Sequence, residues 1–215
     1  MIIAIDGPAA SGKGTLAKAV AAHYGLPHLD SGLLYRAVAH RLLAAGTGLD
    51  DEAAAEEAAR GLDMARLDPA PLRGGEMGEA ASRIAAYPGV RAALVAAQRA
   101  FARQPGGAVI DGRDIGTVIC PQAQVKLFVT AAPEERAKRR WRGLVLGGAP
   151  LDYDAVLADI RRRDARDSGR SISPLRQAQD AALIDTTALD AAGTLAAALA
   201  IVEERMAMER LSRSR

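Results

Sequence analysis

Cysteine and aromatic residues are scarce in this sequence. A single cysteine, Cys120, excludes an intramolecular disulfide and a zinc site built from several cysteines. Aromatic residues make up 3% of the chain, too few for the base-stacking surface of a protein that binds single-stranded nucleic acid. No apolar run approaches the roughly 20 residues of a membrane span, and the first residues lack the basic region and cleavage site of a signal peptide. We therefore expect a cytoplasmic protein that binds neither membranes nor nucleic acid.

The chain also has no large excess of positive or negative charge. The chain has 28 Lys and Arg against 26 Asp and Glu, a net charge of +2, which excludes a protein that coats a polyanion along its whole surface. The 49% of hydrophobic and 25% of charged residues are typical of a globular protein. A length of 215 residues predicts one domain, or one core with an insertion. We expect a monomer.

Short apolar runs alternate with helical patterns along the chain. Buried strands alternating with helices predict an α/β protein whose parallel sheet is covered on both faces. The predicted strands are 2–5, 26–29, 108–110, 125–129 and 182–184. The predicted helices are about 13–23, 33–45, 51–60, 76–86, 90–103, 153–166 and 194–210, with a further helix that begins at Pro133, and 63–75 is predicted to be a loop. About eighty residues separate the second strand from the third, far more than a simple crossover, which indicates an inserted helical subdomain.

A phosphate-binding motif follows the first strand. Gly7-Pro8-Ala9-Ala10-Ser11-Gly12-Lys13 fits G-x-x-x-x-G-K between a predicted strand and a predicted helix. In such a loop the backbone N–H groups and the helix N-terminus face a phosphate, and the lysine reaches the β- and γ-phosphates. The alternative is a chance glycine-rich turn. The residue after the lysine is Gly14 and the hydroxyl of Thr15 is displaced by one position, which leaves direct coordination of Mg²⁺ by Thr15 open.

Three further strings carry candidate site residues. In the string 30–36, Arg36 could bind a phosphate in bidentate fashion, or it could be a surface residue of a helix that Ser31 caps. In 111–117, Asp111 ends a predicted strand, where ligands bind in open parallel sheets and where a carboxylate supports Mg²⁺ directly or through water, or the string is an ordinary Asp-Gly turn. The string 163–170 lies in the second of two basic clusters. These clusters are Arg136, Lys138, Arg139, Arg140 and Arg142, and Arg161, Arg162, Arg163, Arg166 and Arg170; solvated helix faces or a nucleic-acid patch are their alternatives.

Taken together, these strings resemble one family. Gly12-Lys13-Gly14-Thr15 resembles the end of the phosphate loop in nucleoside monophosphate kinases, and the strings 30–36, 111–117 and 163–170 resemble bacterial cytidylate kinase (CMP/dCMP kinase), in the family's order and over essentially the whole chain. The resemblance implies a P-loop NTPase fold with a five-stranded parallel sheet flanked by helices. It also implies a core of about 1–30, 106–138 and 171–215, a helical NMP-binding insertion of about 31–105 and an Arg-rich lid of about 139–170.

The resemblance also implies roles for individual residues. The reaction would be ATP-dependent phosphorylation of CMP or dCMP, part of pyrimidine nucleotide metabolism, with ATP as donor and Mg²⁺. The donor would be bound by Gly7, Pro8, Ala9, Ala10, Ser11, Gly12, Lys13, Gly14, Thr15 and Arg136. The acceptor would be bound by Ser31, Tyr35, Arg36, Ser82, Arg91, Arg113, Asp114, Asp167 and Arg170. Catalysis would rest on Lys13, Arg36, Arg113, Arg163 and Arg170, and Asp111 would support the metal.

One departure from the family stands out. Many members carry a small β-rich insertion where this chain has only about 63–71, so the acceptor-binding subdomain should be smaller. Two other function classes stay open: another small-molecule P-loop kinase, acting on UMP or a sugar acid, and a nucleotide-dependent switch or nucleic-acid-binding ATPase that uses the basic helices.

Overall fold

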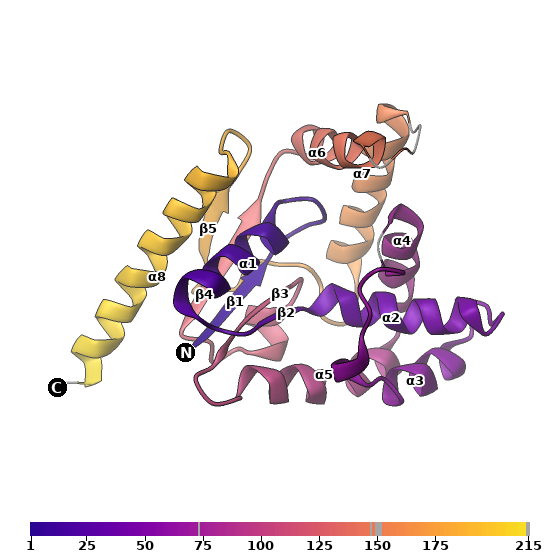
Figure 1. Cartoon of the computed structure of the whole chain (residues 1–215), viewed down its shortest axis with the longest axis horizontal. Coiled ribbons are helices and arrows are strands. Elements are labelled where there is room, and N and C mark those ends of the chain that lie inside the picture. The colour runs from indigo at the N-terminus through magenta and orange to yellow at the C-terminus, as the bar shows by residue number, and fades with distance from the viewer. Residues whose placement is uncertain (73, 147, 149–151, 214–215) are drawn as a thin grey trace.

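The fold is built on a five-stranded parallel sheet. A computed structural model describes residues 1–72, 74–146, 148 and 152–213. The strands are β1 (Ile2–Asp6), β2 (His28–Asp30), β3 (Ala108–Gly112), β4 (Val125–Thr130) and β5 (Ala182–Asp185). Their order is β2-β3-β1-β4-β5, and every neighbouring pair is parallel (Figure 1). The predicted α/β class and the five strands are confirmed.

The helices also follow the predicted pattern. They are α1 (Lys13–Tyr24), α2 (Ser31–Ala44), α3 (Glu52–Arg60), α4 (Gly75–Ile84), α5 (Pro88–Ala102), α6 (Pro133–Leu146), α7 (Tyr153–Gly169) and α8 (Ala191–Arg213). Two short elements were not predicted, the 3₁₀ turn η1 (Met64–Arg66) and the π-helical turn η2 (Ile115–Ile119). Helix α7 runs three residues past its predicted end, so it reaches the residue before Arg170. The sequence also predicts a chain break at 147–150 and a frayed tail at 212–215. Of these, only Gly148 and residues 212–213 belong to the described part of the chain.

Two apolar clusters cover the two faces of the sheet. On β1, Ile3 and Ile5 point to the face that α1 and α8 cover, whereas Ala4 points to the face that α2, α4 and α5 cover. This alternation is the period of two of a strand buried on both faces. A third, smaller cluster joins Ala137 of α6 to Val156 and Ile160 of α7, and it packs against Ala9 of the phosphate loop. Helices α6 and α7 therefore have a core of their own above the loop.

The sheet topology brings the candidate residues to one edge. Strand β1 lies in the middle, with β3 on one side and β4 on the other, and the sequence places the phosphate loop directly after β1. Ligands of open parallel sheets bind beyond the carboxyl ends of strands, where the strand order reverses. Asp6, Asp30 and Asp111 all lie at carboxyl ends on this edge. None of the described helices is long and apolar enough to cross a membrane.

Candidate functional site

The phosphate loop has the backbone of an anion nest. A side chain at Gly7 would overlap the carbonyl oxygen of Val129 on the neighbouring strand, so only glycine fits there. Ala10 and Gly12 have φ angles of 59° and 88°, in the left-handed region that few residues adopt. Alternation between left-handed and right-handed residues turns successive N–H groups toward one point and makes a concave anion site. The loop thus has the backbone shape that binds a phosphate.

Side chains from three elements fix the loop through its carbonyl groups. Lys13 Nζ donates to the Pro8 carbonyl at 3.3 Å, and Thr186 Oγ1 donates to the Ser11 carbonyl at 3.1 Å. Arg136 donates to the Ala9 carbonyl at 3.3 Å and forms a two-pronged ion pair with Asp164 of α7, at 3.0 and 2.7 Å. Arg136 is 3% exposed. It lies behind the loop and lines neither pocket described below, so its expected contact with ATP stays a prediction that this arrangement does not favour.

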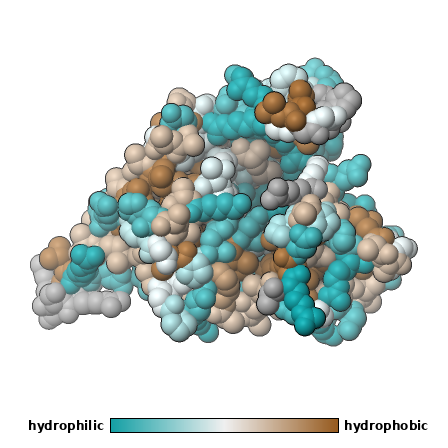
Figure 2. Space-filling view, viewed as in Figure 1, coloured by the Kyte–Doolittle hydropathy of each residue, from teal (hydrophilic) through white to brown (hydrophobic). Residues whose placement is uncertain are grey.

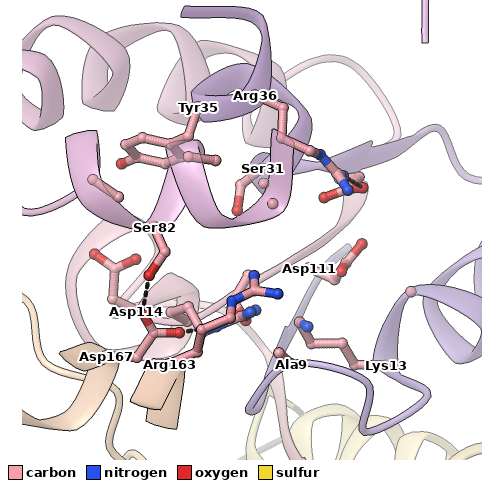
Figure 3. A pocket seen from close by; sticks show the side chains of 18 of the residues that line it. Ala9, Lys13, Ser31, Tyr35, Arg36, Ser82, Asp111, Asp114, Arg163 and Asp167 are labelled. Carbon is pink, nitrogen blue, oxygen red and sulfur yellow. Dashed lines mark hydrogen bonds and ion pairs between the residues drawn. The ribbon is translucent and has the colours of Figure 1, made fainter. Parts of the chain in front are cut away.

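The main pocket opens between the phosphate loop and helices α2, α4 and α7. It gathers fifteen of the predicted site residues: Ala9, Ala10, Lys13, Gly14, Ser31, Tyr35, Arg36, Ser82, Arg91, Asp111, Arg113, Asp114, Arg163, Asp167 and Arg170. Figure 3 shows Lys13 and Asp111 on one side and Ser82, Asp114 and Asp167 on the other. Seven basic side chains line this pocket against four carboxylates, an excess of three positive charges. Figure 2 shows hydrophilic residues across the middle of the molecule. Such a pocket suits a phosphorylated ligand.

Asp167 links α7 to α4 and to the residue that follows β3. Its buried carboxylate accepts hydrogen bonds from Arg113 Nε at 2.8 Å, Arg170 at 2.5 Å and Ser82 Oγ at 3.2 Å. Burial favours the neutral acid, but Arg113 and Arg170 outweigh it and hold the pKa of Asp167 below its usual value. Ser82 of α4, Arg113 directly after β3 and Arg170 directly after α7 thus meet at the carboxylate of Asp167.

Arg91, Asp114 and Tyr35 form a second buried group. Arg91 of α5 pairs with the Asp114 carboxylate, and both residues are about 5% exposed or less. The Arg91 guanidinium lies 5.7 Å from the centre of the Tyr35 ring, a cation–π contact. Taken alone, an arginine near a helix start would be expected at the solvated surface, but Arg91 is buried and paired. This group supplies a guanidinium, a carboxylate and an aromatic face to the pocket.

The start of α2 differs from the expectation for Ser31. Ser31 is the first helical residue, and the N-cap is Asp30, whose side chain makes no capping hydrogen bond. The alternative in which Ser31 caps this helix is therefore wrong, and the hydroxyl of this buried serine lies against Gly112 in the neighbouring strand. The carboxylate of Asp30 is engaged by Arg36 at 2.5 Å. Arg36 is thereby held at the pocket edge.

Asp111 has a partner that the sequence did not indicate. His28 Nε2 donates to Asp111 Oδ1 at 2.7 Å. Parallel pairing aligns Asp30 with Asp111 and His28 with Val109, so β2 brings the imidazole beside the strand end. A histidine two residues before the string 30–36 carries no recognisable signal, and no chemistry was assigned to it. The contact leaves Oδ2 as the carboxylate oxygen nearer Gly14 of the phosphate loop.

Two basic side chains in the pocket, Lys13 and Arg163, have lowered pKa values. Burial, followed by the nearby Arg113 charge, lowers the pKa of Lys13 to about 7. Burial, followed by Arg140 and Arg113, lowers the pKa of Arg163 to about 10. Arg163 is 8% exposed and has no ion pair with any residue that the structure describes. A side chain on Gly78 would meet its guanidinium at 3.3 Å, so glycine lets α4 and α7 approach. Both cations would gain from an anion.

A second pocket lies on the other side of the phosphate loop. Ser11, Gly12 and Thr15 line it, so these predicted donor residues are separated from Lys13 and Asp111. Arg139 and Thr186 also line it, and neither was among the predicted site residues. Arg139 donates to Thr186 Oγ1 at 2.9 Å and to the Thr186 carbonyl at 2.5 Å. The basic cluster around Arg139 was visible in the sequence, but which of its members reaches the loop depends on the packing of α6.

Comparison with known proteins decides the family. A family model for cytidylate kinase matches residues 3–204. The chain belongs to the cytidylate kinase family. A cytidylate kinase of Xanthobacter autotrophicus is 67% identical over 96% of this chain and 99% of the relative, and one of Azorhizobium caulinodans is 64% identical over 94% and 98%.

Solved structures support the fold. A gluconokinase of Sinorhizobium meliloti has a TM-score of 0.52 at 17% identity, over 99% of this chain and 97% of the gluconokinase. An uncharacterised protein of Eubacterium ventriosum has a TM-score of 0.56 at 17% identity, over 95% and 98%. The predicted P-loop kinase fold is confirmed.

The basic residues of α6 and α7 are mostly paired with carboxylates. Eight of the ten basic residues in the two clusters form ion pairs with carboxylates, several of them between α6 and α7 or between α7 and α4. Arg166 of α7, for example, pairs with Glu79 of α4 at 2.6 Å. Paired side chains offer little free charge to a polyanion, so this arrangement does not favour the nucleic-acid patch.

Proposed function

We propose that this enzyme transfers the γ-phosphoryl group of ATP to CMP or dCMP and forms ADP with CDP or dCDP. The observation that carries the proposal is the main pocket itself. It has a phosphate loop at one end and the Arg91–Asp114 pair at the other, with an excess of positive charge between them. A site for two nucleotides that meet at their phosphates needs this distribution.

Lys13 and the loop would hold the donor phosphates. The N–H groups of the loop bind the phosphates, and Lys13 neutralises charge on the group in transfer. A lysine with a pKa near 7 is only partly charged in the free enzyme. Phosphate oxygens beside it would favour the ammonium form, so the donor itself completes the charge of the site.

Asp111 would support Mg²⁺. Its carboxylate lines the pocket beside Lys13 and Gly14, and His28 fixes one of its oxygens. One carboxylate fits Mg²⁺, which keeps several waters and binds substrate phosphates rather than a cage of protein ligands. No group of three His, Cys, Asp or Glu residues that could hold a metal ion occurs among the described residues. Bound Mg²⁺ would neutralise charge on the transferring phosphates. Thr15 lies in the second pocket, which leaves the support to Asp111.

Four arginines would hold the acceptor phosphate. Arg36, Arg113, Arg163 and Arg170 all line the main pocket, from α2, the end of β3 and α7. Two bound nucleotides bring roughly six negative charges, two of them on the acceptor phosphate above its second pKa of about 6. Because the acceptor oxygens are already ionised, no base must remove a proton. Catalysis then consists of in-line positioning and charge neutralisation by these side chains.

Asp114, Arg91 and Ser82 would read the base, and Asp167 would bind the ribose. Cytosine has an amino group and a ring acceptor where uracil has a carbonyl oxygen and a ring N–H. A carboxylate complements the amino group and an arginine complements the ring acceptor. Uracil would set its carbonyl against the Asp114 carboxylate, and two acceptors repel each other. Tyr35 and Ser31 would line the same acceptor site.

The chain would move as three parts. These parts would be the core, the NMP-binding insertion at 31–105 and the lid at 139–170. The first apolar cluster packs the insertion against β1 and β3, and the third packs α7 against Ala137 and Ala9. Closure of the lid over both nucleotides would exclude water that otherwise hydrolyses ATP. We also propose that the enzyme is a cytoplasmic monomer of pyrimidine nucleotide metabolism that binds no nucleic acid.

Base choice tests the proposal. We measure kcat/KM for CMP and UMP in the wild type, in Asp114→Asn and in Asp180→Asn. Asp180 pairs with Lys126 outside both pockets, so it is a matched control for the loss of a carboxylate. A contact of this kind discriminates by about 1–3 kcal/mol, so the wild type should prefer CMP by about ten- to a hundredfold and Asp114→Asn should narrow that ratio. An unchanged ratio in Asp114→Asn would remove Asp114 from base reading.

A further inference from the structure

Asp6 is a buried carboxylate to which the proposed function gives no role. It ends β1, immediately before Gly7 of the phosphate loop, and it is 4% exposed. Its Oδ1 accepts a hydrogen bond from the backbone N–H of Ile115 at 2.8 Å, and its Oδ2 accepts one from Gly116 at 2.7 Å. Both oxygens of this carboxylate are thus used to hold the first residues of turn η2.

Turn η2 depends on an outside acceptor at this point. Its later N–H groups bond within the turn: those of Val118 and Ile119 donate to the Asp114 carbonyl, at 2.8 and 3.1 Å. The first N–H groups of any helical turn lack such a partner. A side chain at the N-cap position commonly supplies it, and aspartate is among the residues that do so best. The N-cap residue of η2 is itself an aspartate, Asp114.

Asp114 does not cap its own turn. Its side chain makes no capping hydrogen bond, and its carboxylate pairs instead with Arg91 in the main pocket. Asp6 satisfies the N–H groups that Asp114 would otherwise bind. The geometry therefore points to Asp6 as a positioning residue: we propose that it caps η2 from β1 and so frees the Asp114 carboxylate to face the acceptor base. This inference rests on the proposed base-reading role of Asp114.

The surroundings leave Asp6 little freedom to be replaced. Gly116 is enclosed by Lys126 and by Asp6, at 3.2 and 3.4 Å from the position that a side chain would take. An asparagine at position 6 would keep the shape but would set an NH₂ group against one backbone N–H. Two donors would then face each other, and the turn would need another acceptor. The nearest capping carboxylate along the chain is Asp114, which would have to leave Arg91 to reach it.

The test compares base selectivity in Asp6→Asn with that of the wild type. We expect the CMP/UMP ratio of kcat/KM to fall about fivefold or more and KM for CMP to rise, while KM for ATP changes less than about twofold. A merely structural role would lower stability and leave the ratio unchanged. Thr117→Val is the matched control, because the Thr117 hydroxyl in the same turn has no hydrogen-bond partner among the described residues, and it should keep the CMP/UMP ratio of the wild type.

The variant Asp114→Asn distinguishes failure of base reading by Asp114 from failure of the role of Asp6. If Asp114→Asn keeps the ratio of the wild type, the proposed base reading fails. If Asp114→Asn narrows the ratio and Asp6→Asn does not, only the role of Asp6 fails. In the double variant, Asp6→Asn should narrow the ratio no further, since it acts through Asp114; an additive effect contradicts the proposal. Asp6→Ser, smaller and neutral, serves if Asp6→Asn does not fold, and failure of both to fold would overturn the proposal in favour of a purely structural carboxylate.

Discussion

Removal of the Asp167 charge should destabilise the free enzyme and make it sensitive to anions. Asn at position 167 keeps the shape of the side chain but leaves Arg113 and Arg170 without a counter-charge. Neither arginine forms an ion pair with any other residue in the described part of the chain. Arg163, itself buried and unpaired, lies in the same pocket, so three guanidinium groups would repel each other across it.

The size of the effect follows from burial. Breaking a fully buried pair by removing one partner costs about 3–5 kcal/mol. Here the Asp167 side chain is 3% exposed and that of Arg170 6%, but Arg113 is 20% exposed, so water compensates part of the loss. We therefore expect a loss of about 2–3 kcal/mol in the free energy of unfolding. For a domain of this size, that lowers Tm by about 4–12 °C.

The loss of stability is measured by thermal and urea unfolding of Asp167→Asn and of the wild type, with Asp180→Asn as the exposed control. The native pKa of Asp167 lies below the unfolded value of 3.8, so its stabilising effect is present at neutral pH and is lost as the pH falls below that value. The difference between the two proteins should shrink accordingly in acid. Inorganic phosphate should raise Tm of the variant more than that of the wild type. A fall in Tm under about 1 °C, or equal shifts with phosphate, would refute this reasoning.

Three further outcomes are expected. Lys13→Ala should keep the fold and lose turnover by several orders of magnitude in an ADP-release assay, because Lys13 neutralises the transferring group; near-normal turnover contradicts the donor site. Since the pKa of Lys13 is lowered to about 7, its side chain is mostly neutral at pH 8, and binding of a non-hydrolysable ATP analogue at that pH should take up nearly one proton. Calorimetry in buffers of different ionisation enthalpy measures this uptake, which should almost vanish in Lys13→Met. Hydrogen exchange in 139–170 should slow when CMP and that analogue bind together, and unchanged exchange at saturation would argue against a lid.

The sequence predicted most of the fold because its signals are local. The apolar run of β1 is buried on both faces, and the glycines of the phosphate loop stand where the backbone needs them. Turn η2 was not predicted, and its first two N–H groups bond to Asp6, a residue more than a hundred positions away. No local pattern encodes such a partner.

The sequence also predicted most residues of the site, but not those whose place depends on helix packing. Motif resemblance found Asp114, Asp167 and Arg113, and the pocket brings them together. It also favoured Arg136 over Arg139 as a donor contact, whereas Arg136 is turned into the protein by Asp164 and Arg139 lines the second pocket. Both arginines belong to α6, and only the packing of α6 against α7 and β5 decides which one faces the loop.

The central claim is that this pocket phosphorylates a cytosine nucleotide. The most direct measurement is release of ADP from ATP with CMP, dCMP, UMP, AMP or gluconate as acceptor, each with and without RNA. We predict rapid ADP release with CMP or dCMP, a rate with UMP lower by about tenfold or more, little with AMP or gluconate, and no effect of RNA. Preferred turnover of UMP or gluconate, or ADP release that depends on RNA and not on CMP, would contradict the account.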